Sequence, residues 1–138
     1  MEITDAIIYA LQLLPELVHL DLSLCLQVTD AVVGCLDPNK IERLELPYKP
    51  TGSAVVTNSA VQQLVDRGFS RLRSLSIGGK GIDDDALELM AMLPETLISV
   101  KLWHTKVTSV GLARFLNVTG LAVDDSMATS RGTYMLCL

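Results

Sequence analysis

Residues 17–36 read LVHLDLSLCLQVTDAVVGCL, and this stretch joins the two patterns that decide the fold. Its first six residues follow L-x-x-L-x-L, whose last positions alternate with the period of two that is typical of a strand. Its last nine residues place apolar side chains at Val28, Val33 and Leu36, a spacing that suits the buried stripe of a short helix. The predicted unit is therefore one strand followed by one helix.

Both patterns recur along the chain, and the helix-type pattern does so at intervals of 25 to 28 residues. Strand-type copies begin at positions 17, 41, 72 and 97, and helix-type copies begin at positions 3, 28, 56, 82 and 107. In each helix-type copy the first residue, Ile or Val, is followed by Thr, Asp, Asn or Ser, and we expect these polar residues to cap the helix by accepting hydrogen bonds from its first N–H groups. A single strand-helix unit cannot bury its apolar face alone, so the period predicts units that stack.

These residues resemble the leucine-rich repeats, and within them the cysteine-containing class, which is F-box-associated and ribonuclease-inhibitor-like. The stretch at 17–36 carries the likeness best, with Cys25 at the cysteine position of that class. The other copies depart from it, because the same position holds Lys49, Lys80 and Thr105. The resemblance implies a right-handed α/β solenoid with short parallel strands on the concave side, helices on the convex side and protein-protein binding.

Two segments are expected on this basis. Residues 1–116 would form the leucine-rich repeat solenoid, with an N-terminal half repeat followed by four strand-helix repeats. Residues 117–138 would form a C-terminal cap or a partly disordered tail, because the pattern decays after Phe115. Bare ends of a repeat stack favour edge-to-edge self-association or membership of a larger complex.

Composition narrows the class of function. The net charge of −5 and the isoelectric point near 4.8 argue against a nucleic-acid surface, which needs clustered Lys and Arg. No apolar run approaches the roughly 18 residues that span a bilayer, and the start lacks the basic end of a signal peptide. We therefore expect an intracellular, cytoplasmic protein of eukaryotic type that binds no membrane.

No catalytic, cofactor or metal site is expected. The two histidines, His19 and His104, belong to strands three repeats apart, too remote for a shared metal or a catalytic triad when strands lie about 4.8 Å apart. The glycine-rich turn at 78–81 lacks the spacing of a phosphate-binding loop and is interpreted as a tight turn. Cys25 and Cys35 are interpreted as buried structural thiols. The sequence indicates a protein that is not an enzyme.

The concave face is the predicted binding surface. Residues between the inward leucines should point outward from each strand. Trp103, the only tryptophan, falls at such a position, although it could instead pack on the flanking loop. Residues 47–53 form an insertion in the second repeat, and insertions often lie at the binding edge of a solenoid. The predicted protein-binding residues are His19, Asp21, Arg43, Glu45, Tyr48, Lys101, Trp103 and His104.

Three functions remain open from the sequence. The first is a non-catalytic protein-interaction scaffold, because the pattern serves stacking and display. The second, suggested by the resemblance, is the substrate-recognition part of a ubiquitin-ligase adaptor, although no F-box segment precedes residue 3. The third is a structural subunit buried in a larger assembly, which the high apolar content and bare ends favour.

Overall fold

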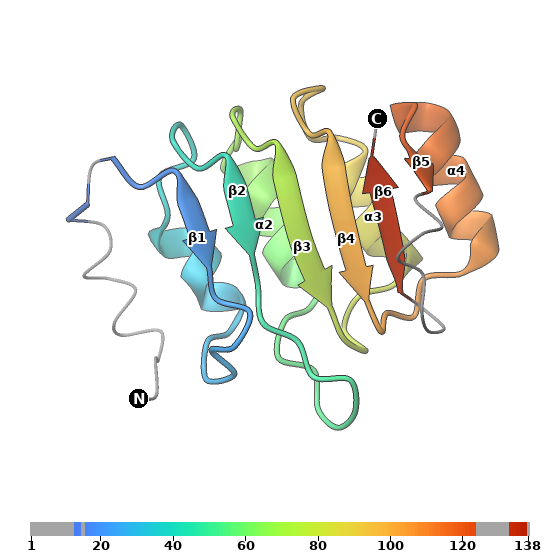
Figure 1. Cartoon of the computed structure of the whole chain (residues 1–138), viewed down its shortest axis with the longest axis horizontal. Coiled ribbons are helices and arrows are strands. Elements are labelled where there is room, and N and C mark those ends of the chain that lie inside the picture. The colour runs from blue at the N-terminus through green and yellow to red at the C-terminus, as the bar shows by residue number, and fades with distance from the viewer. Residues whose placement is uncertain (1–12, 15, 124–132, 138) are drawn as a thin grey trace.

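The chain folds as a mixed α/β structure with a single sheet of six strands (Figure 1). The computed structural model describes residues 13, 14, 16–123 and 133–137. The helix-type copy that begins at position 3 lies outside these described residues. The α/β class expected from the sequence is confirmed, and the order of strands across the sheet is β1-β2-β3-β4-β6-β5.

Four strands lie at the positions that L-x-x-L-x-L predicts. They are β1 His19–Asp21, β2 Arg43–Glu45, β3 Ser74–Gly78 and β4 Ser99–Trp103, and each is parallel to the next. Their register aligns the same position of each copy, so that Leu20, Leu44, Leu75 and Val100 form one row. The four copies of the sequence pattern therefore superimpose residue by residue in the sheet.

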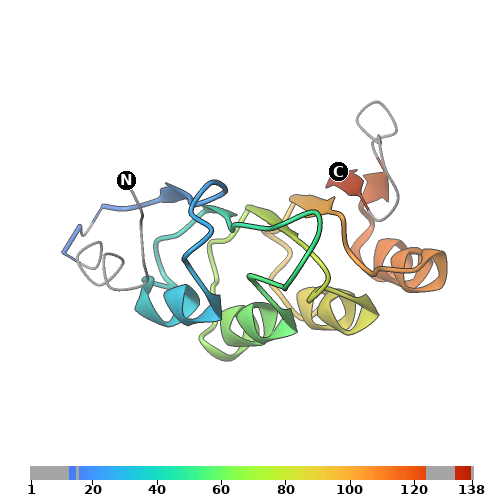
Figure 2. The same cartoon turned by 90° about the horizontal axis from the view of Figure 1, so that it is seen from below.

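The described part of the chain has four helices on one face of the sheet, of which three connect these strands and the last follows β4 (Figure 2). They are η1 Asp30–Cys35, α2 Asn58–Asp66, α3 Asp84–Met90 and α4 Ser109–Thr119. The first differs from the expected α-helix, because it is a six-residue 3₁₀ helix. It contains a glycine and two adjacent valines, which are poor formers of α-helix, so a short 3₁₀ helix is consistent with its sequence.

The core lies between the helices and the sheet. The inward leucines of the central strands are closed off from solvent, with Leu44 and Leu75 at 0% exposure and Leu102 likewise. Full burial of a side chain of this size stabilises a fold by about 1.5 to 3 kcal/mol. Cys35 is buried as expected, whereas Cys25 is only partly buried, because its turn lies at the end of the sheet.

The predicted helix caps are confirmed at every described helix. Thr29, Thr57, Asp83 and Thr108 are the N-cap residues, and each side chain accepts a hydrogen bond from a backbone N–H group in the first turn. Such a cap satisfies one of the orphaned donors at a helix start and contributes about 1 kcal/mol. The repeated motif of the sequence therefore fixes where each helix begins.

The same residues also join neighbouring repeats, a role that their interpretation as caps did not predict. The residue after each of the first three caps bonds to the cap of the next repeat, and we call this series of three rungs the polar ladder. Asp30 accepts bonds from Thr57 N and Oγ1 at 2.8 and 2.5 Å. Asp84 accepts the equivalent pair from Thr108 at the same distances.

The middle rung of the polar ladder has different chemistry. Here the cap of the later repeat is Asp83, whose carboxylate cannot donate a hydrogen bond. The residue that follows the cap of the earlier repeat is Asn58. Asn58 Nδ2 donates to Asp83 Oδ1 at 2.7 Å, and Asp83 N donates to Asn58 Oδ1 at 3.3 Å. An amide carries both a donor and an acceptor, so it complements a carboxylate where a second carboxylate would repel it.

The carboxyl end of the chain corrects the expectation of parallel strands alone. Strand β6 Tyr134–Cys137 pairs antiparallel with β4, and β5 Ala122–Val123 pairs antiparallel with β6. The sequence did not indicate β6 because Met135 and Leu136 are both buried, at 6% and 1% exposure, so no alternation marks the strand. The position expected to end the solenoid, 116, falls inside α4.

Candidate functional site

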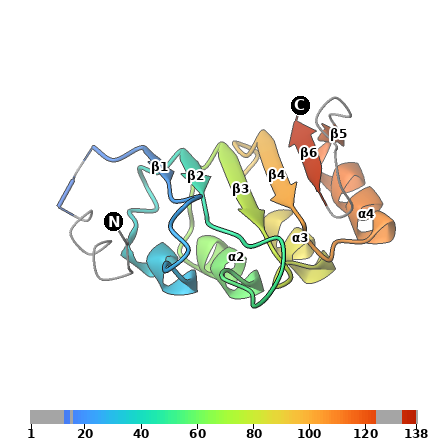
Figure 3. The same ribbon diagram turned by 60° about the horizontal axis from the view of Figure 1, so that its bottom comes forward.

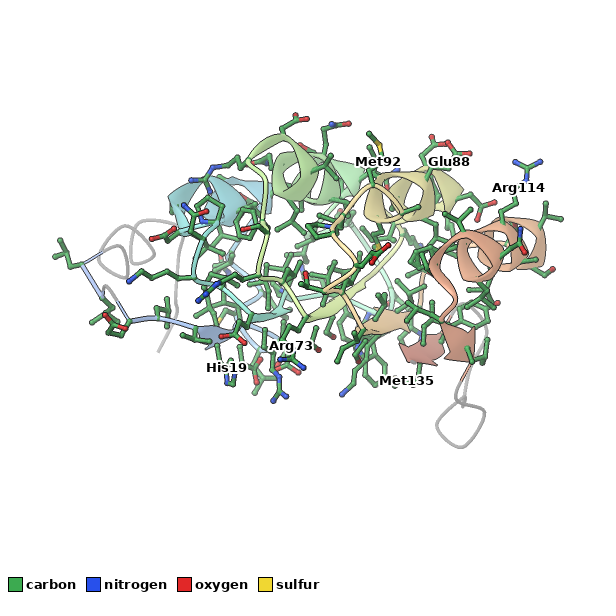
Figure 4. The ribbon with its side chains drawn as sticks, turned by 90° about the horizontal axis from the view of Figure 1, so that it is seen from above. His19, Arg73, Glu88, Met92, Arg114 and Met135 are labelled. Carbon is green, nitrogen blue, oxygen red and sulfur yellow. The ribbon has the colours of Figure 1, made fainter. Side chains whose placement is uncertain are left out.

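The candidate site is the sheet face that points away from the helices, which we call the open face. Figure 4 shows His19, Arg73 and Met135 on this side, whereas Glu88, Met92 and Arg114 project from the helices. Outward positions of the strands supply most of its side chains, in the register expected from the sequence. Two adjacent hollows lie on this face.

The first hollow, which we call the cationic hollow, has a volume of about 460 Å³ and lies where the strands begin. Three of its cations, Arg43, Arg73 and Lys101, have exposed side chains. None of them takes part in an ion pair, because the one ion pair within the described part of the chain joins Lys40 to Glu16 at 3.7 Å. The cationic hollow is lined by His19, Glu42, Arg43, Glu45, Arg73, Ser74, Ile98, Ser99 and Lys101.

An acidic pair borders the cationic hollow. Asp21 and Glu45 are opposite each other in the register of β1 and β2. Asp21 Oδ1 accepts bonds from Ser23 Oγ at 2.6 Å and from Ser23 N at 2.9 Å, and these bonds lower the pKa of Asp21. Burial raises the pKa of Glu45, the negative charge of Asp21 raises it further, and the charges of Lys101 and Arg43 oppose the increase.

The second hollow, which we call the aromatic hollow, has a volume of about 410 Å³ and lies beyond the carboxyl ends of the strands. It shares Glu45 and Lys101 with the cationic hollow, so the two are continuous across the middle of the sheet. Leu24 and Leu26 border it with 92% and 44% of their surface exposed. The aromatic hollow is lined by Ser23, Leu24, Leu26, Glu45, Tyr48, Pro50, Ser76, Lys101 and Trp103.

A stack of aromatic rings forms one wall of the aromatic hollow. The rings of Tyr48 and Trp103 are nearly parallel, with an angle of 1° between their planes and 5.8 Å between their centroids. His104 also stacks with Tyr48, with 5.9 Å between the ring centroids and an angle of 28° between the planes. Tyr48 comes from the long connection between β2 and α2, which leaves the sheet at the carboxyl end of β2 (Figure 3). The insertion predicted at 47–53 thus contributes directly to this wall.

Trp103 is not the fully exposed side chain that the sequence predicted. It is half-buried, because it stacks on Tyr48 of the flanking loop, and its Nε1–H donates to Ser76 Oγ at 2.9 Å. This contact covers Ser76, which is only 7% exposed although its position points outward. Packing on the loop, the alternative considered for Trp103, is therefore what the structure contains.

Gly78 allows the two rings to meet across β3. A Cβ atom at this position would lie 2.3 Å from the carbonyl oxygen and 2.7 Å from the Cβ of Trp103, and 3.0 Å from the ring of Tyr48. Gly79, which follows it, has a backbone φ of 93°, in the region that glycine adopts readily. The glycine turn therefore serves a tight turn and a close approach.

All eight residues predicted to bind protein lie on or beside the open face. Four line the cationic hollow and four line the aromatic hollow, with Glu45 and Lys101 in both. Asp21 contacts this surface through Glu45, and His104 through the aromatic stack. Sequence reasoning missed Arg73, Leu24 and Leu26, because they lie in connections where the two-residue period does not apply.

Another hollow of about 280 Å³ lies on the helix side between α3 and α4. Its walls are mainly apolar and include Leu87, Phe115 and the exposed side chains of Val110 and Val118. This surface is separate from the open face, because it belongs to the opposite side of the molecule. We treat it as a secondary candidate for contact with other proteins.

Within the described residues, no group of three or more His, Cys, Asp or Glu side chains is arranged to hold a metal ion. None of the helices that the structure describes is both long and apolar enough to cross a membrane.

Neither a protein-family model nor a curated protein matched the chain when it was compared with them. The open face therefore offers charge, hydroxyl groups and aromatic surface as its means of recognition.

Proposed function

We propose that this chain is a leucine-rich repeat protein of the cysteine-containing class and a non-catalytic scaffold that binds a protein partner on its open face. Support for the repeat class comes from four strand-helix units whose strands are parallel and aligned, with all their helices on one side. In this proposal the units wind as a right-handed solenoid, and the open face is its concave surface.

The observation that carries the binding role is the continuity of the cationic and aromatic hollows on one exposed sheet face. Interfaces concentrate their binding energy in Trp, Tyr and Arg residues, and this face presents Trp103, Tyr48, Arg43 and Arg73 together. We propose an intracellular, cytoplasmic setting, which suits the free thiols of Cys25 and Cys35.

A second candidate is a structural subunit of a larger assembly. The exposed side chains of Leu24, Val110, Val118 and Met92 favour it, because each leaves apolar surface in water on one side of the molecule or the other. The substrate-recognition part of a ubiquitin-ligase adaptor is a special case of the first proposal, in which the partner on the open face would be the substrate.

Capture of partners from a eukaryotic cell lysate tests the scaffold proposal. The bait is the intact chain, compared with an Arg43→Glu, Lys101→Glu double variant, with each of its two single variants, and with a single-reversal control on the helix side, Arg114→Glu. We expect a protein that is retained by the intact chain and by the control but lost from the double variant. Equal retention of every captured protein by all three baits would refute a binding role for the open face.

Circular dichroism separates lost binding from lost folding. Arg43 and Lys101 are exposed, and neither forms an ion pair within the described part of the chain, so their reversal should leave the spectrum unchanged. A partner that is instead lost through Val110→Ser, Val118→Ser would favour the structural-subunit candidate, because those side chains lie on the opposite surface.

A further inference from the structure

We propose that the partner binds the open face as an extended acidic-apolar peptide segment, with an acidic side chain in the cationic hollow and an apolar side chain about four residues away in the aromatic hollow. This inference rests on the proposed function and specifies the chemistry of its partner. Four features of the open face support it, namely the distribution of unpaired charge, the free hydroxyl groups, the spacing of the hollows and the apolar surface.

Cationic side chains outnumber the acidic ones in the cationic hollow. Arg43, Arg73 and Lys101 converge on one hollow without an ion pair in the described part of the chain. Two carboxylates, Glu42 and Glu45, line the same hollow, so its three cations exceed the carboxylates by one. The whole chain carries a net charge of −5, so this hollow is a local reversal of the overall sign. Charge complementarity therefore favours an anionic group in the cationic hollow.

Hydroxyl groups on the floor of the cationic hollow add hydrogen-bond donors. Ser74 and Ser99 are neighbours in the register of β3 and β4, and both are half-buried. Neither side chain has a hydrogen-bond partner among the described residues. A carboxylate accepts bonds only, so guanidinium groups beside free hydroxyl groups match its requirements.

The spacing of the two hollows fits an extended chain. Ser99 lines the cationic hollow and Trp103, four positions later on β4, lines the aromatic hollow. A strand rises about 3.3 Å per residue, so the two points are about 13 Å apart. An extended peptide that runs along β4 spans this distance with about four residues. The ligand therefore needs an acidic and an apolar residue at that separation.

The aromatic hollow has apolar surface that is exposed to water when no ligand is bound, and the apolar end of the ligand would cover it. Leu24 has 92% of its surface exposed, and it lies beside Leu26, Pro50 and the rings of Tyr48 and Trp103. A Leu or Phe side chain of the ligand would remove this surface from water together with its own. Aromatic walls of this kind are typical of binding hot spots.

Fluorescence of the single tryptophan gives a direct assay, because Trp103 lies in the wall of the aromatic hollow. The probe is a short synthetic peptide with a pair of Glu residues, a two-residue spacer and a Leu-Phe pair. We expect saturable binding with a blue shift of the tryptophan emission and an affinity that falls as salt is added. Binding is expected to weaken at least tenfold with Arg43→Glu and to be unchanged with the Arg114→Glu control.

Matched peptides separate the two parts of the proposal. Replacement of both Glu residues by Gln should reduce affinity at least tenfold, and replacement of the Leu-Phe pair by Ser should abolish the spectral shift. Removal of the two-residue spacer should weaken binding, because the Glu pair and the Leu-Phe pair could no longer reach both hollows at once. A third peptide carries Lys at both Glu positions and should not bind. Equal affinity for the Glu, Gln and Lys peptides, or tighter binding of the Lys peptide, would overturn the inference.

The peptide assay and the lysate experiment fail in distinguishable ways. If a lysate protein depends on Arg43 and Lys101 while no acidic peptide binds, the scaffold function stands and the acidic-apolar ligand is wrong. If neither a lysate protein nor a peptide responds to the charge reversals, both the scaffold function and this inference are wrong.

Discussion

Asn58→Asp is the substitution that tests the polar ladder most sharply. Asn58 Nδ2 donates to Asp83 Oδ1 at 2.7 Å, so the change removes a donor and places a second carboxylate against the first. Loss of a hydrogen bond to a charged group costs about 1.5 to 3 kcal/mol. Repulsion between two carboxylates about 4 Å apart in high dielectric adds about 1 kcal/mol, and a negative charge at a helix start returns about 0.5 kcal/mol.

The expected cost is therefore about 2 to 3.5 kcal/mol of unfolding free energy at neutral pH, although the change adds no volume. A second substitution, Asp83→Thr, should recover most of it in the Asn58→Asp background. The pair then reproduces the Asp30 to Thr57 rung, in which a threonine donates to an aspartate through both N and Oγ1. Threonine also remains a good helix cap, so α3 keeps its first hydrogen bond.

Urea denaturation followed by far-ultraviolet circular dichroism measures all four members of this double-mutant cycle. We expect the double variant to lie within about 1 kcal/mol of the intact chain and the coupling energy between the two positions to be about 2 kcal/mol. A double variant that is no more stable than Asn58→Asp alone would refute the complementarity that we assign to the rungs. A matched control, Asn39→Asp in an exposed turn, should change stability by less than about 0.5 kcal/mol.

Three further predictions concern the open face and the packing of the repeats. Glu45→Gln should remove a pH dependence of stability, because the raised pKa of Glu45 means that the folded chain binds its proton more tightly than the unfolded chain does. The intact protein should therefore lose stability as the pH rises through and above 4.5. In urea denaturation at several pH values, the variant should be the more stable of the two at neutral pH and show no advantage below that range. Gly78→Ala should cost about 1 to 3 kcal/mol and red-shift the emission of Trp103, because the added methyl group would overlap the tryptophan backbone; an unchanged spectrum and thermal midpoint would contradict this. Arg67→Ala should cost about 1 to 3 kcal/mol in thermal unfolding, because the guanidinium group donates to carbonyl oxygens at the end of η1, and a Lys replacement should recover only part of the loss.

Much of the sheet was predictable because its determinants are local and repeated. Leu20, Leu44 and Leu75 occupy the same position of L-x-x-L-x-L, and that position alone sets their common row. The helix starts were predictable for the same reason, since a polar cap acts within one turn. The bonds from Asp30 and Asn58 to the next repeat were not predicted, because they depend on how two helices lie side by side.

The candidate site was predictable in its residues and less so in its shape. Alternation along a strand shows which side chains face outward, and this placed Arg43, Glu45 and Lys101 on one face. The burial of Trp103 depends on a loop that crosses from β2 and on the missing side chain of Gly78, and neither follows from periodicity. Strand β6 was missed because its four residues pair with a strand more than thirty positions earlier.

The antiparallel pairing of β6 with β4 bears on how such a chain can change its length during evolution. Each residue of β4 from Ser99 to Leu102 already has a partner in β6, so a further repeat appended after the carboxyl terminus would find no parallel neighbour there. Duplication of an internal strand-helix unit would leave this pairing intact. The antiparallel pairing therefore limits growth of the sheet beyond β4, whereas β1 at the other edge has one side without a partner among the described strands.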